Sequence, residues 1–143
     1  MRKTLIIVGI LCSMTTIGQE LDCSEFRNGV FFAEVNEPFK AKWKITRTGN
    51  EQVEEVIEIP KEVKDMGYPV KPHFELIEWI DNCSYKLKYD ESKAVLSESQ
   101  KVINENGGVL STITKIEGNC YYYTSTLLIN GTEQIINGII CKE

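Results

Sequence analysis

The sequence predicts an all-β fold: an eight-stranded antiparallel meander, either an up-and-down barrel or a related sandwich, with one short helix. Short segments rich in β-branched and aromatic residues recur along the 143-residue chain, and turn-forming residues separate them. Four of the five cysteines lie beyond residue 18, a pattern typical of small disulfide-stabilised domains.

Residues 1–18 have the three parts of a secretory signal peptide. Arg2 and Lys3 are basic, residues 5–12 are apolar, and a short stretch of small and polar residues follows. The apolar run is shorter than the roughly 20 residues that a transmembrane helix needs. We therefore expect cleavage before Gln19 and a single domain over residues 19–143. A buried N-terminal strand is the alternative.

The expected destination is the periplasm or the extracellular space. Leu11 is bulky where lipoprotein processing requires a small residue, which argues against a lipid anchor on Cys12. Without Arg2 and Lys3, 14 basic residues remain against 21 acidic ones, a net charge of −7. Such an acidic domain is a poor partner for nucleic acid.

The strands are expected to form sequential hairpins. If the sheet closes on itself, no strand edge stays exposed. Residues 60–72 contain three prolines and a glycine, which predicts a loop, and Ser97 and Gln100 fit a capping box at the start of a helix over 97–106. The predicted strands cover residues 29–35, 41–48, 51–59, 73–80, 83–90, 109–116, 120–129 and 132–141.

The Asn130-Gly131 turn predicts one disulfide. A two-residue turn fixes the register, and counting outward from it places Cys120 opposite Cys141 at a non-hydrogen-bonded pair. Cα atoms at such a pair are about 4.5 Å apart, within disulfide reach. The second bridge is then Cys23–Cys83 by elimination. Zinc binding is the alternative for the four cysteines, but no C-x-x-C spacing supports it.

Two further turns predict which side chains face the interior. If Asp81-Asn82 is a two-residue turn, Phe74, Leu76 and Glu78 face inward, and Glu78 lies opposite Tyr85. If Gly49-Asn50 is one, Arg47 lies opposite Gln52 on the inner face. The candidate ligand-binding residues are Arg47, Gln52, Glu54, Trp43, Glu78, Tyr85 and Tyr89.

These residues have a functional and a structural interpretation. In the first, Arg47 holds the anionic or polar head of a ligand, and Trp43, Tyr85 and Tyr89 line the apolar part of a barrel cavity. In the second, which is the more common situation, Arg47 and Glu54 form an internal salt bridge that plugs one end of the barrel.

Catalysis has little support in the sequence. It contains no nucleophile elbow, phosphate-binding loop, zinc-protease motif or dinucleotide fingerprint, and it has one histidine. We expect a non-catalytic protein without a cofactor or metal, with no transmembrane span, and monomeric.

Three motifs resemble those of an uncharacterised family of small secreted bacterial proteins with a lipocalin-like layout. They are Cys23-x-x-Phe26-x-x-Gly29-x-Phe31, Ile45-x-Arg47-x-x-x-x-Gln52-x-Glu54, and Trp79-Ile80-Asp81-Asn82-Cys83-x-Tyr85. Gly29-x-Phe31 is similar to the Gly-x-Trp start of lipocalins, with phenylalanine in place of tryptophan.

The leading functional hypothesis is an exported barrel that binds a small hydrophobic or amphipathic molecule. The alternative is a filled barrel that acts as an envelope or extracellular interaction module, or as an inhibitor of another protein. A continuous apolar cavity above roughly 300 Å³ would favour the first hypothesis.

Overall fold

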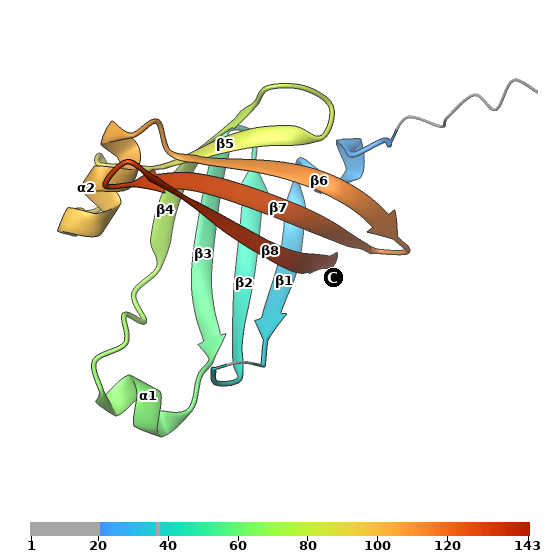
Figure 1. The fold of residues 1–143 in the computed structure, drawn as a ribbon. Helices are drawn as coiled ribbons and strands as arrows, with labels where there is room; N and C mark the ends of the chain where they lie inside the picture. Colours follow the sequence, from blue (N-terminus) through green and yellow to red (C-terminus); the bar gives the residue numbers. More distant parts are fainter. Residues whose placement is uncertain (1–20, 37) are drawn as a thin grey trace, which may run out of the picture.

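The computed structural model describes residues 21–36 and 38–143 and shows a closed antiparallel barrel. Each strand pairs with the next one along the chain, and β8 pairs with β1 (Figure 1). This arrangement confirms the predicted eight-stranded meander. The predicted signal peptide lies outside the described residues.

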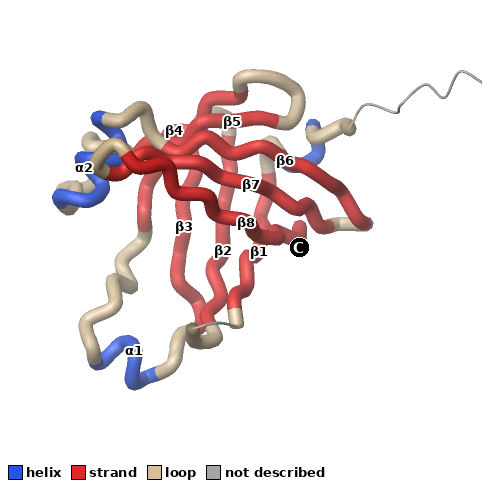
Figure 2. The backbone as a smooth tube through the Cα atoms, in the orientation of Figure 1, coloured by secondary structure: helices blue, strands red, loops and turns tan. Residues whose placement is uncertain are grey.

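The strands match the predicted segments to within one or two residues (Figure 2). Two α-helices and one 3-10 turn interrupt them. The elements in chain order are η1 (Ser24–Phe26), β1 (Gly29–Val35), β2 (Ala41–Thr48), β3 (Glu51–Glu58), α1 (Lys61–Asp65), β4 (His73–Trp79), β5 (Ser84–Tyr89), α2 (Glu98–Glu105), β6 (Val109–Glu117), β7 (Cys120–Ile129) and β8 (Thr132–Lys142).

The helices follow local sequence signals. The capping box of α2 is confirmed, because the Ser97 hydroxyl accepts from the Gln100 backbone N–H and the Gln100 side chain accepts from the Ser97 backbone N–H. The predicted 60–72 loop contains the five-residue helix α1, which starts after Pro60. Proline is well tolerated there because the first helical positions need no backbone N–H.

Two predicted registers are confirmed. Arg47 pairs with Gln52 across β2 and β3, and Cys120 pairs with Cys141 across β7 and β8. Asn130 has φ 52° and Gly131 has φ 75°, as a two-residue hairpin turn with positive φ at both positions requires. Both predicted disulfides form, with Cα atoms 3.9 Å apart at Cys120–Cys141 and 5.2 Å apart at Cys23–Cys83.

The predicted register between β4 and β5 is wrong by one residue. The Ile80 backbone N–H donates to the Ser84 carbonyl, so the loop holds three residues rather than two. The Asp81 carboxylate stabilises this longer loop by accepting from the backbone N–H groups of Cys83 and Ser84 at 2.8 and 2.7 Å.

That single residue reverses the two faces of β4, because side chains alternate between them. Glu78, predicted to be buried opposite Tyr85, is exposed on the outer face opposite Lys86. Tyr85 instead faces Trp79, and Glu75 is the buried carboxyl group of the strand, 7% exposed.

The two ends of the barrel differ. β8 pairs with β1 only where residues 31–33 meet residues 140–142, and the rest of β8 diverges from β1 (Figure 1). At the paired end, η1 packs across the barrel and Cys23–Cys83 ties it to the β4–β5 loop. We call this the closed half and the splayed end the open half. The main core fills the closed half with Cys23, Phe26, Phe31, Ile45, Ile77, Tyr85, Ile113, Tyr121 and Ile140.

We predict that the two disulfides contribute unequally to stability. Cys23–Cys83 spans 60 residues and Cys120–Cys141 spans 21, so the chain-entropy estimates are about 4 and about 3 kcal/mol. Cys23 is also fully buried. Urea unfolding of the Cys23→Ala/Cys83→Ala and Cys120→Ala/Cys141→Ala variants should show the larger loss for the first pair. Equal losses, or the reverse order, would contradict this view of the closed half.

Candidate functional site

A single buried guanidinium occupies the centre of the closed half. Arg47 is 2% exposed and points inward from β2. Its Nε donates to the Gln52 side-chain oxygen at 2.7 Å, and one terminal nitrogen donates to the Phe26 backbone carbonyl at 2.9 Å. The other terminal nitrogen donates to the hydroxyl oxygens of Tyr85 at 3.0 Å and Tyr121 at 2.9 Å. Four of the five N–H groups of Arg47 are therefore used within the fold.

Aromatic rings enclose the same guanidinium. Its central carbon lies 4.7 Å from the centroid of Tyr85 and 5.4 Å from that of Phe31. Burial by itself lowers the pKa of Arg47, but the Tyr85 and Tyr121 hydroxyl groups raise it, and the net direction is upward. Arg47 thus stays charged although it has no direct carboxylate partner among the described residues.

Gln52 links Arg47 to two carboxyl groups. Its side-chain nitrogen donates to Glu54 at 2.9 Å and to Glu75 at 2.6 Å. The predicted direct salt bridge between Arg47 and Glu54 is therefore replaced by a bridge through the amide. We call Gln52, Glu54 and Glu75 the polar layer. Gln52 is 1% exposed and Glu54 is half-buried, so this layer leads from the closed half toward the open half.

Burial dominates the protonation of the two carboxyl groups. It raises the pKa of Glu54, against the opposing influence of Arg47. It raises the pKa of Glu75 still further, because the nearby Glu54 charge adds to the cost of ionising a second carboxyl group. The same surroundings affect Tyr89. Its pKa is raised to about 12, mainly by burial and further by the charges of Glu75 and Glu54.

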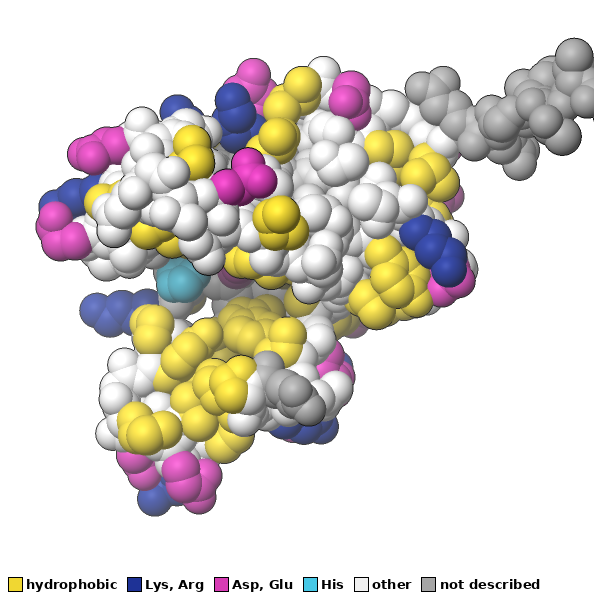
Figure 3. Space-filling view, in the orientation of Figure 1, with side chains coloured by type: hydrophobic (Ala, Val, Ile, Leu, Met, Phe, Trp, Pro, Cys, Tyr) yellow, Lys and Arg dark blue, Asp and Glu magenta, His cyan; other side chains and the backbone are white. Residues whose placement is uncertain are grey.

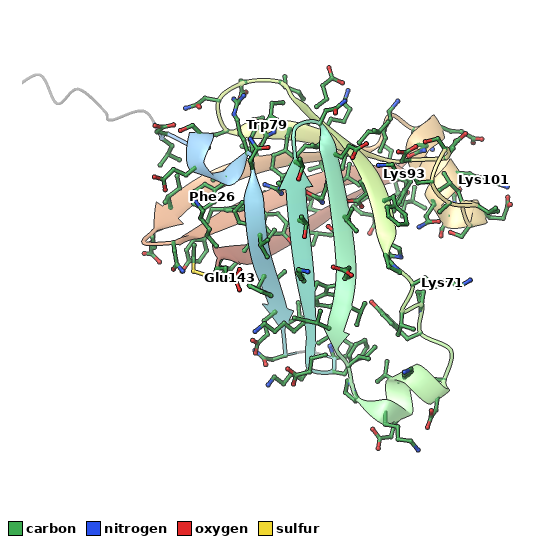
Figure 4. The ribbon with its side chains drawn as sticks, turned by 180° about the vertical axis from the view of Figure 1, so that it is seen from behind. Phe26, Lys71, Trp79, Lys93, Lys101 and Glu143 are labelled. Atoms are coloured by element: carbon green, nitrogen blue, oxygen red, sulfur yellow. A yellow bond between two sulfur atoms is a disulfide. The ribbon has the colours of Figure 1, made fainter. Side chains whose placement is uncertain are left out.

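Six of the seven predicted site residues face the interior, in two separate groups. Arg47, Gln52 and Tyr85 belong to the closed half, whereas Glu54, Tyr89 and Trp43 face the open half. Glu78 is the exception, on the outer surface. In Figure 4, seen from behind, Phe26 and Trp79 mark the closed half, and Lys71 lies on the loop between α1 and β4.

Sequence reasoning missed three participants. Glu75 was missed because the wrong β4–β5 register placed it on the outer face of the barrel. Tyr121 follows from the confirmed pairing of Cys120 with Cys141, because alternation places Tyr121 and Tyr123 on the inner face. The Phe26 carbonyl has no sequence signal of its own, since it depends on how η1 folds across the barrel end.

The open half has an apolar inner face that is only partly covered. Val35 is 40% exposed and Ile136 is 50% exposed, although alternation directs both inward. Figure 3 shows hydrophobic side chains in a hollow between the part of the molecule that carries α1 and the part that carries α2. Two other inward apolar residues there, Ala41 and Leu127, are buried. Six more are half-buried: Ala33, Trp43, Val56, Leu87, Tyr89 and Tyr123.

A cleft of about 570 Å³ adjoins this face. His73 and Tyr89 line it together with the loops before β4 and before α2. His73 pairs with Glu54 across β3 and β4, and Tyr89 pairs with Glu75 across β4 and β5. The cleft is therefore lined by two residues whose strand partners are Glu54 and Glu75. Burial lowers the pKa of His73, which favours its neutral form beside Glu54.

No family model matches this chain, and no curated protein or solved structure matches it either. Within residues 21–36 and 38–143, no three His, Cys, Asp or Glu side chains are grouped so that they could hold a metal ion. No helix in the same part of the chain is long and apolar enough to cross a membrane.

We predict that Arg47 is essential for folding. Arg47→Met would leave four acceptors without their donor, and breaking such a buried charged network costs about 3–5 kcal/mol. The matched control is Lys44→Met on the outer face of β2, which should change stability by about 0.5 kcal/mol or less. Urea unfolding measures both. Similar small losses would mean that the network is dispensable.

We also predict a pH-dependent gain in stability from Glu75→Gln. The pKa of Glu75 in the folded protein lies well above 4.5, so its contribution to stability is full below pH 4.5 and is lost as the pH rises through the folded-state pKa. Glutamine carries no charge and can still accept from Gln52. The variant should be more stable than the parent at about pH 8, by more than the roughly 0.5 kcal/mol of surface substitutions, and the difference should shrink toward about pH 5.

The control for this experiment is Glu78→Gln, two residues along the same strand but on its exposed outer face. Urea unfolding at both pH values should show no comparable gain for it. A pH-independent effect of Glu75→Gln would contradict the raised pKa.

Proposed function

We propose that this protein is exported and binds a small amphipathic molecule in the open half of its barrel. The observation that carries the proposal is the uncovered apolar inner face, with Val35 and Ile136 both exposed by 40% or more. Soluble proteins bury such inward-facing side chains unless a ligand or partner uses the surface. The binding mode is an apolar tail along this face and a polar head at Glu54 and Glu75.

The cleft beside the open half supports the tail. The adjoining cleft of about 570 Å³ falls in the roughly 300–1,000 Å³ range of small-molecule sites. Each methylene that leaves water there contributes about 0.8 kcal/mol. Trp43 is the best-placed reporter of such a tail, because it is half-buried and faces the open half from β2.

The polar layer supports a hydrogen-bond-donating head. Four N–H groups of Arg47 donate within the closed half. Arg47 is therefore not placed to hold an anionic head, the role that the functional interpretation of the sequence gave it. Glu54 and Glu75 each accept from Gln52 with one oxygen, which leaves their second oxygens as acceptors. An amine head would also favour the ionised forms of these two carboxyl groups, which burial and their mutual repulsion disfavour.

The covalent structure supports export. Two disulfides indicate an oxidising compartment. The signal-like pattern of residues 1–18 agrees with this compartment. We infer a binding role without catalysis, in the periplasm or outside the cell.

We predict that Trp43, but not Trp79, reports ligand binding. The two tryptophans lie in opposite halves, so Trp79→Phe leaves the open-half reporter and Trp43→Phe leaves the closed-half one. Titration with dodecylamine below its micelle concentration should change the emission of the Trp79→Phe variant saturably and leave the Trp43→Phe variant unchanged. A response from Trp79 alone would place binding elsewhere.

Dodecanol and dodecanoate have the same tail and test the head. Dodecylamine should bind roughly tenfold or more tightly than dodecanol, as a charge-assisted hydrogen bond implies, and dodecanoate most weakly. Glu75→Gln should reduce the preference for the amine, and the outer-face control Glu78→Gln should not. If none of the three binds, the filled-barrel interaction module becomes the better proposal.

A further inference from the structure

One edge of β8 has no strand partner along most of its length. β8 pairs with β7 from Thr132 to Cys141, but its pairing with β1 is confined to residues 140–142. Among the described residues, no strand covers the other edge over residues 132–139. Residues 132–137 are all exposed. The edge lies where β8 diverges from β1 in Figure 1.

The hairpin geometry identifies the free backbone groups. Ile129 and Thr132 flank the two-residue turn and form a hydrogen-bonded pair, so even-numbered residues of β8 bond to β7. The Lys142 backbone N–H donates to the Asn119 carbonyl, in agreement with this alternation. Glu133, Ile135 and Asn137 therefore direct both their N–H and C=O groups at the free edge.

The side chains of this edge lack the usual protection against strand pairing. Proteins shield free edges with lysine, proline, bulges or several charges. Residues 132–139 contain no proline and no lysine, and Glu133 is the one charged residue. Ile135 is 61% exposed and Ile139 is 44% exposed on the outer face. This combination fits an extended strand as the missing partner.

We propose that the partner is β8 of a second copy of this chain, paired antiparallel about a two-fold axis at Ile135. This register places Ile135 opposite Ile135 of the second copy and Glu133 opposite Asn137. Glu133, Ile135 and Asn137 then all form hydrogen-bonded pairs, and each pair exchanges two bonds. The pairing keeps clear of residues 140–142, which β1 already uses.

Charge complementarity favours a second copy over an unrelated strand. The Asn137 side-chain oxygen accepts from the Thr124 hydroxyl at 2.7 Å, which leaves the amide nitrogen to donate. Across the two-fold axis that nitrogen meets the Glu133 carboxylate, twice in one interface. No like charges face each other, and the exposed isoleucine is covered by its own copy. The dimer differs from the monomer expected from the sequence.

Cross-linking tests the register directly. In the proposed pair the two Ile135 Cα atoms are about 5.5 Å apart, within disulfide reach. Ile135→Cys should therefore form a disulfide-linked dimer under mild oxidation. Glu133→Cys is the matched control, because four residues of strand separate the two copies of position 133 by about 13 Å. Equal cross-linking of both variants, or none at Ile135→Cys, would overturn the register.

Sedimentation velocity at about 100 µM tests the association itself. The parent should sediment as a dimer and Ile135→Lys as a monomer, because lysine places two like charges at the axis. Ile135 is exposed, so the variant should keep the circular dichroism spectrum of the parent and, at concentrations too low for dimerisation, its unfolding midpoint. A parent that stays monomeric, or an Ile135→Lys variant that still dimerises, refutes the proposal.

Discussion

The need to satisfy one buried cation determines how the closed half is built. A guanidinium withdrawn from water is stable only if its N–H groups find acceptors, and Arg47 finds them on four separate segments. The Phe26 carbonyl requires η1 to cross the barrel end, and the tyrosine hydroxyls require β5 and β7 to point those rings inward. The Cys23–Cys83 bridge holds η1 in that place. The contacts that bury the Arg47 guanidinium are thus the same contacts that close this end of the barrel.

The same cation divides the interior into two halves. Gln52 presents its oxygen to Arg47 and its nitrogen to Glu54 and Glu75, so a neutral amide separates the guanidinium from the carboxyl groups. On one side of this layer the barrel is filled with aromatic and aliphatic side chains. On the other side the strands diverge, and apolar residues stay partly uncovered. The polar layer thus places hydrogen-bond acceptors beside an apolar opening, which is the arrangement that an amphipathic ligand needs.

Hairpin signals predicted most of the fold, and one turn accounts for the main error. Asn130-Gly131 and Gly49-Asn50 fixed their registers because two-residue turns leave no freedom in pairing. Asp81-Asn82 looked like a third case, but the Asp81 carboxylate accepts two backbone N–H groups and supports a loop of three residues. Glu75 and Glu78 consequently exchanged places. The divergence of β8 from β1 has no local signal, because it depends on how eight strands tilt around a common core.

The positions of the two disulfides also determine how the domain would respond to tension. A pull on both ends of the chain passes from Cys23 directly to Cys83, and from Cys120 directly to Cys141. Strands β1–β4 and the β7–β8 hairpin lie inside these covalent loops and bear none of the load. Between the two bridges, the segment from Cys83 to Cys120, which contains β5, α2 and β6, can be drawn out. A domain with these two bridges would lengthen by a limited, fixed amount before a covalent bond had to break.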